Sequence, residues 1–184
     1  MTALIRPVFA LGATEFRVAL RNRWVTITVI LMALFALVLS ATGSAPTGEV
    51  GVDALSVTAA SLTSLGVYLV PLMALLMSFD AVAGEVERGT LSLTLTYPVS
   101  RSGILMGKFA AHLTVLAMAV GAGYGLAAIA ALAIDPEAVT GLPALVRLFW
   151  SSILLGAVFL ALGYALSAIA RRPGAAAGLA IGVW

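Results

Sequence analysis

The fold of this chain is decided by the stretch FAAHLTVLAMAVGAGYGLAAIAALAI, residues 109–134, which contains no Asp, Glu, Lys or Arg. A helix of about 20 apolar residues crosses the hydrocarbon core of a bilayer. Three further stretches lack these charged residues: Trp24 to Gly48, Ala54 to Phe79 and Leu148 to Ala170. Each of the four stretches is long enough to cross the bilayer, so we predict a membrane protein with several spans.

The overall composition supports a helical membrane protein. Hydrophobic residues make up 62% of the chain and charged residues 10%, whereas soluble domains contain about 25% charged residues. Backbone groups in lipid must bond within the protein, and the apolar stretches lack the alternation of barrel strands. We therefore predict an all-α polytopic membrane protein with no nucleic-acid partner. The absence of cysteine excludes disulfides, thiolate metal sites and thiol nucleophiles within this sequence.

We predict a single transmembrane domain over residues 1–184. An apolar stripe containing Phe9 and Phe16 predicts an interfacial helix at 4–23, although a basic flank that only sets topology is the alternative. Complete spans are predicted at 24–42, 58–79, 104–134 and 148–170, and a truncated fifth at 174–184. Because the last stretch is too short to span, we expect a fragment whose continuation completes the fifth span and adds a sixth.

The basic residues predict the orientation of these spans. Nine of the ten lie in the N-terminal segment, in the segment 80–108 or directly after the fourth span, and only Arg147 lies on the opposite side. Lys and Arg favour cytoplasmic loops. We therefore expect the N-terminus and the segment 80–108 to be cytoplasmic.

The segment 80–101 is the loop richest in polar chemistry, and we expect it to include a short helix along the membrane surface. Its candidate functional residues are Asp80, Gly84, Glu85, Glu87, Arg88, Gly89, Thr90, Pro98 and Arg101. A solvated loop whose charges only set topology is the alternative. However, acidic residues contribute little to orientation, so docking of a cytoplasmic partner would better explain them.

The run DAVAGEVERGTL at 80–91, followed by LTYPVSR at 95–101 and GK at 107–108, resembles the permease subunits of ABC-2 transporters. Val86 departs from the pattern, because a charged residue is common there. The resemblance implies a type V exporter-like fold with an interfacial helix and six spans. It also implies that the segment 80–101 couples to a separate cytoplasmic ATPase, which holds ATP and Mg²⁺. This chain would then be a non-catalytic subunit that binds no cofactor.

A narrower resemblance concerns RNRW at 21–24, SLTSL at 61–65, YLVPL at 68–72 and LTYP at 95–98. These motifs resemble the corresponding segments of permeases that serve copper-centre maturation in nitrous oxide reductase. That resemblance implies a homodimer in a bacterial or archaeal inner membrane, with a cytoplasmic ATPase and a periplasmic copper-maturation protein as partners. Two alternatives stay open: an ABC-2 exporter permease for a drug, lipid or glycan, and a non-transporting membrane scaffold or assembly factor.

Other polar positions offer weaker sites. The segment 103–109 lacks the glycine spacing and the Ser or Thr of a phosphate-binding loop, and we expect Lys108 to extend to the lipid headgroups. His112, Met73 and Met77 are weak candidates for metal ligands, but methionine in an apolar helix usually packs. We therefore expect no metal site. No catalytic set of residues is apparent, so we do not predict an enzyme.

Overall fold

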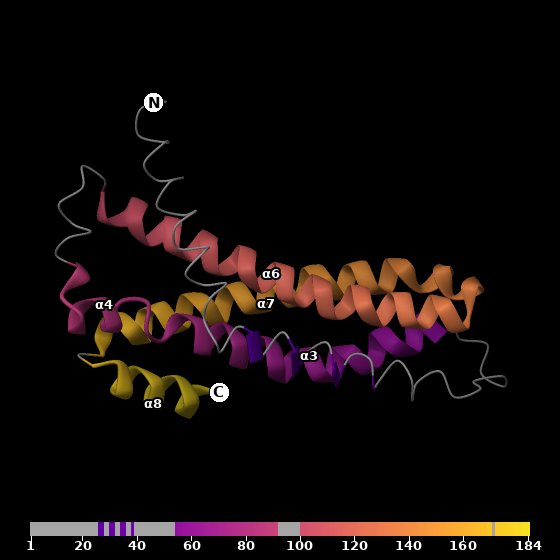
Figure 1. Ribbon diagram of the computed structural model, residues 1–184, viewed down its shortest axis with the longest axis horizontal. Coiled ribbons are helices and arrows are strands. Elements are labelled where there is room, and N and C mark those ends of the chain that lie inside the picture. Colours follow the sequence, from indigo (N-terminus) through magenta and orange to yellow (C-terminus); the bar gives the residue numbers. More distant parts are fainter. Residues whose placement is uncertain are drawn as a thin grey trace. The chain divides into compact units, whose positions relative to one another are not determined.

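The computed structural model describes residues 26–27, 30–31, 34–35, 38, 54–91, 100–170 and 172–184. Every regular element in these ranges is a helix and none is a strand, which confirms the predicted all-α class. The elements are α3 (Ala54–Ser78), α4 (Ala83–Glu87), α6 (Arg101–Ile134), the 3₁₀ helix η1 (Pro136–Gly141), α7 (Leu142–Ile169) and α8 (Pro173–Val183) (Figure 1). The predicted interfacial helix at 4–23, most of the predicted first span at 24–42 and Pro98 lie outside the described residues.

Three helical segments are long and apolar enough to cross a membrane. They are Leu55–Glu87, Arg101–Ile134 and Pro136–Ile169. Large apolar side chains also cover the outer surfaces of the helices; Leu154, for example, is 68% exposed. Such extensive apolar exposure is unfavourable in water and is expected of surfaces that face lipid. The chain is therefore a multi-pass membrane protein.

The connection between α6 and α7 follows from two consecutive residues. Asp135 has an extended backbone, with φ −133° and ψ 97°, because the residue before a proline avoids the helical conformation. The Asp135 carboxylate accepts a hydrogen bond from the Glu137 backbone N–H at 3.1 Å, which caps η1. Helix α7 then begins at Leu142, ahead of the predicted span at 148–170. Arg147 stays helical because its stem can reach a polar surface without breaking the helix.

Two prolines have different effects on the helices. Pro71 lies inside α3, which continues through it as one element; the missing N–H removes one backbone hydrogen bond, a loss that membrane helices tolerate. Pro173 is at the start of α8, directly after Arg172, whose backbone is extended. Proline favours this first helical position, where an N–H would have no partner within the helix.

The chain divides into two compact units. Unit 1 comprises Met1–Thr26, Pro71–Leu116 and Gly156–Trp184, and unit 2 comprises Ile27–Val70 and Ala117–Leu155. Within unit 1, α4 contacts α8 (Figure 1). The largest fully buried side chains of unit 1 include Met73, Leu75 and Leu116. The long helices α3, α6 and α7 contribute residues to both units.

Unit 2 contains a polar contact between buried side chains. The Tyr124 hydroxyl on α6 and the Ser152 hydroxyl on α7 are 2.9 Å apart and share a hydrogen bond. Gly66 on α3 faces this pair, because a Cβ atom at position 66 would lie 2.6 Å from the Tyr124 Oη. Glycine therefore allows α3 to approach the tyrosine closely. Close approach at a small residue combined with a side-chain hydrogen bond is a usual way for membrane helices to associate.

We predict that Gly66→Ala destabilises the protein by about 1–3 kcal/mol, because the added methyl group overpacks the Tyr124 hydroxyl. The control is Gly125→Ala on α6, since a Cβ atom there meets nothing within 4 Å. Unfolding of both variants in detergent micelles measures the difference. Equal stability of the two variants would contradict this account of Gly66.

Candidate functional site

The predicted coupling residues from Asp80 to Thr90 lie in unit 1, around the short helix α4. The turn after α4 contains Gly89, which has a positive φ of +70°; no other residue in the described part of the chain has a positive φ. Side chains with a Cβ atom rarely adopt this conformation, whereas glycine does so at no steric cost. Gly89 thus allows the chain to turn sharply after α4.

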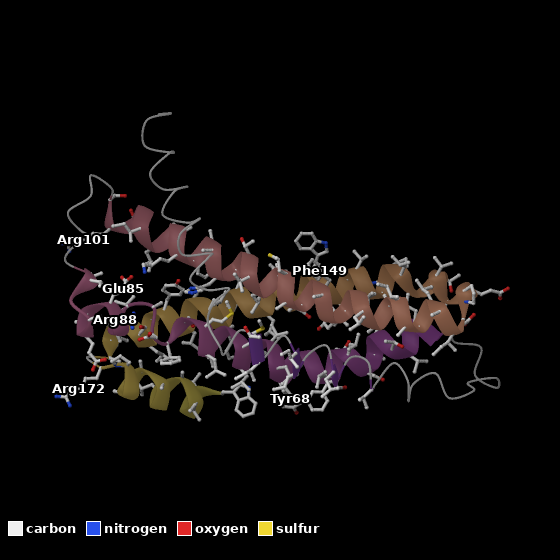
Figure 2. All side chains as sticks on the ribbon, in the orientation of Figure 1. Tyr68, Glu85, Arg88, Arg101, Phe149 and Arg172 are labelled. Atoms are coloured by element: carbon white, nitrogen blue, oxygen red, sulfur yellow. The ribbon has the colours of Figure 1, made fainter. Side chains whose placement is uncertain are left out.

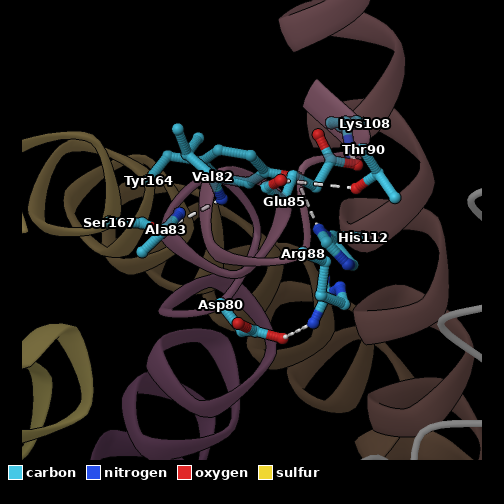
Figure 3. Close-up of polar contacts among 10 residues, drawn as sticks. All are labelled: Asp80, Val82, Ala83, Glu85, Arg88, Thr90, Lys108, His112, Tyr164 and Ser167. Atoms are coloured by element: carbon cyan, nitrogen blue, oxygen red, sulfur yellow. Dashed lines mark hydrogen bonds and ion pairs between the residues drawn. The ribbon is translucent and has the colours of Figure 1, made fainter. Parts of the chain in front are cut away.

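The start of α4 is capped by a residue that is distant in sequence. The backbone N–H groups of Val82 and Ala83 both donate to the Ser167 Oγ, each at 3.0 Å (Figure 3). Val82 occupies the N-cap position and no side-chain hydrogen bond caps the helix from there. The first N–H groups of a helix have no partner within it, so Ser167 on α7 supplies the acceptor that the local sequence lacks.

Gly84 and Asp80 are in close contact. A Cβ atom at position 84 would overlap the Asp80 carboxylate, so glycine is what lets that carboxylate lie against α4. Asp80 Oδ2 accepts a hydrogen bond from Arg88 Nη1 at 3.2 Å. The Arg88 and Asp80 side chains are 56% and 41% exposed, so water screens this pair, which contributes roughly 0–1 kcal/mol. The pair therefore connects the residues before and after α4 but adds little to the stability of the segment.

A second ion pair in the segment is largely buried. Lys108 Nζ on α6 donates to Glu85 Oε1 on α4 at 2.5 Å, and the side chains are 5% and 15% exposed. The other carboxylate oxygen, Glu85 Oε2, is buried and has no hydrogen-bond partner within the described part of the chain. The expectation that Lys108 extends to the headgroups is therefore wrong. The ammonium group instead forms a charge-assisted hydrogen bond to the carboxylate, and such bonds are stronger than hydrogen bonds between neutral groups.

His112 and Tyr164 form a further polar contact within unit 1. A hydrogen bond of 2.5 Å joins His112 Nδ1 on α6 to the Tyr164 hydroxyl on α7 (Figure 3). The Tyr164 ring also packs against Phe109, with ring centroids 6.1 Å apart. This arrangement gives the single histidine a structural explanation, because the contact joins two membrane helices.

The weak metal candidates include two methionines on α3. Met73 and Met77 are buried on α3. Among the described residues, no group of three or more His, Asp or Glu side chains could hold a metal ion. The sequence-based expectations about metals and cofactors therefore stay predictions.

The structure separates the predicted coupling residues into two sets. Asp80 and Glu85 pair with Arg88 and Lys108 inside the same chain, so their carboxylates are engaged before any partner binds. The exposed members of the predicted set are Glu87, Arg88, Gly89, Thr90 and Arg101. Figure 2 shows the labelled residues Glu85, Arg88, Arg101 and Arg172 toward one end of unit 1.

Sequence reasoning did not assign two of the contacts that hold α4. A lone lysine beside an apolar helix could have indicated a buried acidic partner, so the Lys108 contact had a signal. Ser167 had none, because a serine in an apolar helix commonly bonds its own backbone, as Ser78 does to Ala74 O at 2.7 Å. Only the three-dimensional structure reveals the Ser167 cap.

The long apolar helices, with a charged segment between two of them, are those of a multi-pass membrane protein. The chain belongs to the family of ABC-2 family transporter proteins, whose family model matches residues 9–184. This membership confirms the resemblance that was based on the segment 80–108.

Two curated relatives share the name "Probable ABC transporter permease protein NosY". The relative from Pseudomonas aeruginosa is 47% identical over 179 residues, which cover 96% of this chain and 65% of that protein. The relative from Stutzerimonas stutzeri is 45% identical over 187 residues, which cover 98% of this chain and 66% of that protein. The chain thus spans about two thirds of the length of the relatives it matches.

We predict that Ser167→Ala releases the start of α4, because it leaves two backbone N–H groups without their acceptor at a cost of about 1–3 kcal/mol. Hydrogen exchange at the Val82 and Ala83 amides should accelerate. The matched control is Ser151→Ala on the same helix, where the exposed hydroxyl bonds only the Arg147 carbonyl at 2.9 Å among the contacts described. Unchanged exchange in the Ser167 variant would mean that another group caps α4.

Proposed function

We propose that this chain is a permease subunit that converts movement of a separate cytoplasmic ATPase into movement of its own membrane helices. The observation that supports this most directly is the attachment of α4. Its start is bound to α7 through Ser167 and its side chain Glu85 to α6 through Lys108, while Glu87 and Thr90 are exposed. A force applied to the exposed side of α4 would therefore reach two long helices.

The proposed orientation has the N-terminus and α4 in the cytoplasm of a cell with an inner membrane. The distribution of basic residues supports it, because nine of ten lie on the side of the segment 80–108. In this arrangement ATP and Mg²⁺ bind to the partner subunit, and this chain has no catalytic residues of its own. Membership of a permease family agrees with such a division of labour.

The docking surface that we propose consists of Glu87, Arg88 and Thr90, next to the exposed apolar side chain of Val86. Exposed groups of both charges beside an apolar residue suit a protein partner, since interfaces combine an apolar centre with polar contacts. Asp80 and Glu85, which we also predicted to take part in coupling, have a different role in this proposal. Because they pair within the chain, they shape the segment, and the exposed residues bind the partner.

We predict that Glu87→Arg weakens binding of the ATPase, because reversing an interfacial charge creates like-charge repulsion. The amount of ATPase recovered with the permease should fall about tenfold. The measurement is the ratio of ATPase to permease after affinity purification of the full-length complex from membranes. Glu137→Arg is the control, because Glu137 is also exposed but belongs to unit 2. A photoreactive residue at position 90 should capture the ATPase.

Equal ATPase recovery from the two charge-reversal variants would contradict the proposed docking surface. Absence of any ATPase in stoichiometric amount from the wild-type purification would instead favour the third hypothesis, a non-transporting membrane scaffold. The two results are distinguishable because the first still recovers the ATPase with the wild-type chain.

At a finer level, we propose that the transporter works in copper-centre maturation of nitrous oxide reductase. The motifs at 21–24, 61–65, 68–72 and 95–98 support this role, and the two NosY-named relatives agree with it. The same proposal includes a second copy of the chain, forming a homodimer, and a periplasmic copper-maturation protein.

We predict that deleting the gene lowers the copper content of nitrous oxide reductase in the periplasm, because maturation of its copper centre then lacks the ATP-driven step. Metal analysis of the purified reductase measures the loss, and expression of the intact gene should restore it. Normal copper content in the deletion strain would favour the other ABC-2 hypothesis, an exporter permease for a drug, lipid or glycan.

A further inference from the structure

Helix α4 cannot hold its conformation by itself. It contains five residues, whereas isolated helices shorter than about 12–15 residues are marginal in water. Its N-terminal hydrogen bonds come from Ser167 on α7, and its buried side-chain contact comes from Lys108 on α6. The position of α4 therefore depends on those two helices as well as on its contact with α8, and a displacement of α4 that keeps these bonds must be shared with α6 and α7.

The two attachments of α4 differ physically. Ser167 is a neutral acceptor that holds the backbone at the start of the helix. The Glu85–Lys108 pair is ionic and largely buried. Separating such a pair breaks a largely buried charge-assisted contact, which is far more costly than stretching a neutral hydrogen bond. The ion pair is thus the contact that resists separation of α4 from α6.

We propose that Lys108 is a positioning residue that makes α6 follow α4 when the ATPase moves. This inference rests on the proposed function, and it assigns transmission to the buried pair rather than to the exposed Asp80–Arg88 pair. Lys108 touches no nucleotide and no cargo in this mechanism. It acts by holding Glu85 Oε1 against the first turns of α6.

The geometry of the pair predicts which substitutions preserve transmission. Lys108 bonds one oxygen of Glu85, while Oε2 has no partner within the described residues. An arginine at this position keeps the charge and presents donors for both oxygens, so Lys108→Arg should preserve the attachment. The double variant Glu85→Gln with Lys108→Met removes the ionic contact without leaving a single buried charge, so it should fold while losing the attachment.

The first experiment examines the attachment in the full-length permease without its ATPase. Hydrogen exchange at the amides of Val86 and Arg88 should accelerate in the neutral double variant and stay near wild type in Lys108→Arg. Tyr164→Phe is the control, because it removes the buried hydrogen bond to His112 between α6 and α7 and leaves both α4 contacts intact. Unchanged exchange in the double variant would overturn the proposal whether or not an ATPase binds.

The second experiment examines transmission in the complex, reconstituted in lipid nanodiscs. A spin label is attached at Met106→Cys, since Met106 is 62% exposed on α6 and residues 1–184 contain no cysteine; any cysteine elsewhere in the complex is first replaced by serine. Spectra are compared without nucleotide and with ATP trapped by vanadate. We expect a nucleotide-dependent change in the wild type, in Lys108→Arg and in Tyr164→Phe, and its loss in the neutral double variant.

The outcomes separate this inference from the proposed function. If the double variant binds the ATPase and still shows the nucleotide-dependent change at position 106, Lys108 has no positioning role. If Tyr164→Phe loses the change as well, the effect reflects general loosening and the proposal is equally overturned. Failure of the ATPase to bind the wild-type chain would refute the proposed function, and the exchange experiment would then decide the attachment alone.

Discussion

The structure depends on the requirement that backbone and side-chain polar groups find partners inside the protein, because lipid supplies none. The long helices α3, α6 and α7 meet it with their own backbone hydrogen bonds. Buried side chains meet it in pairs, such as Tyr124 with Ser152 and His112 with Tyr164. Each pair joins two helices, so satisfying the polar groups also determines how those helices pack.

Helix α4 meets the same requirement in a different way. Its first N–H groups, like those of any helix, have no partner within the helix, its N-cap residue supplies none, and it also contains Glu85, whose charge is largely buried. Ser167 and Lys108 satisfy these groups from α7 and α6. A segment that borrows its partners from two membrane helices cannot move independently of them. This dependence is the physical reason for regarding the segment as a point where force enters the membrane domain.

Much of the fold could be predicted from the sequence, because long uncharged stretches have few alternatives to a helix. Helix α6 ends at Ile134, where Asp135 and Pro136 follow, and the backbone preferences of these two residues are local. Helix α7 begins at Leu142, ahead of the predicted span at 148–170, because a long basic side chain such as that of Arg147 can remain on a helix. Local sequence determined these boundaries only where a strong conformational preference was present.

The predicted segment 80–101 includes α4, but the roles of its acids could not be derived from sequence. Glu85 and Lys108 are separated by 23 positions, and the partner of Val82 and Ala83 is about 85 positions away. Such contacts depend on tertiary packing rather than on a local pattern.

The dependence of α4 on partners from other helices limits the design of inhibitors. A synthetic peptide copying residues 80–91 would lack both borrowed partners and be unstructured in solution, so a useful competitor would need a covalent staple to replace them.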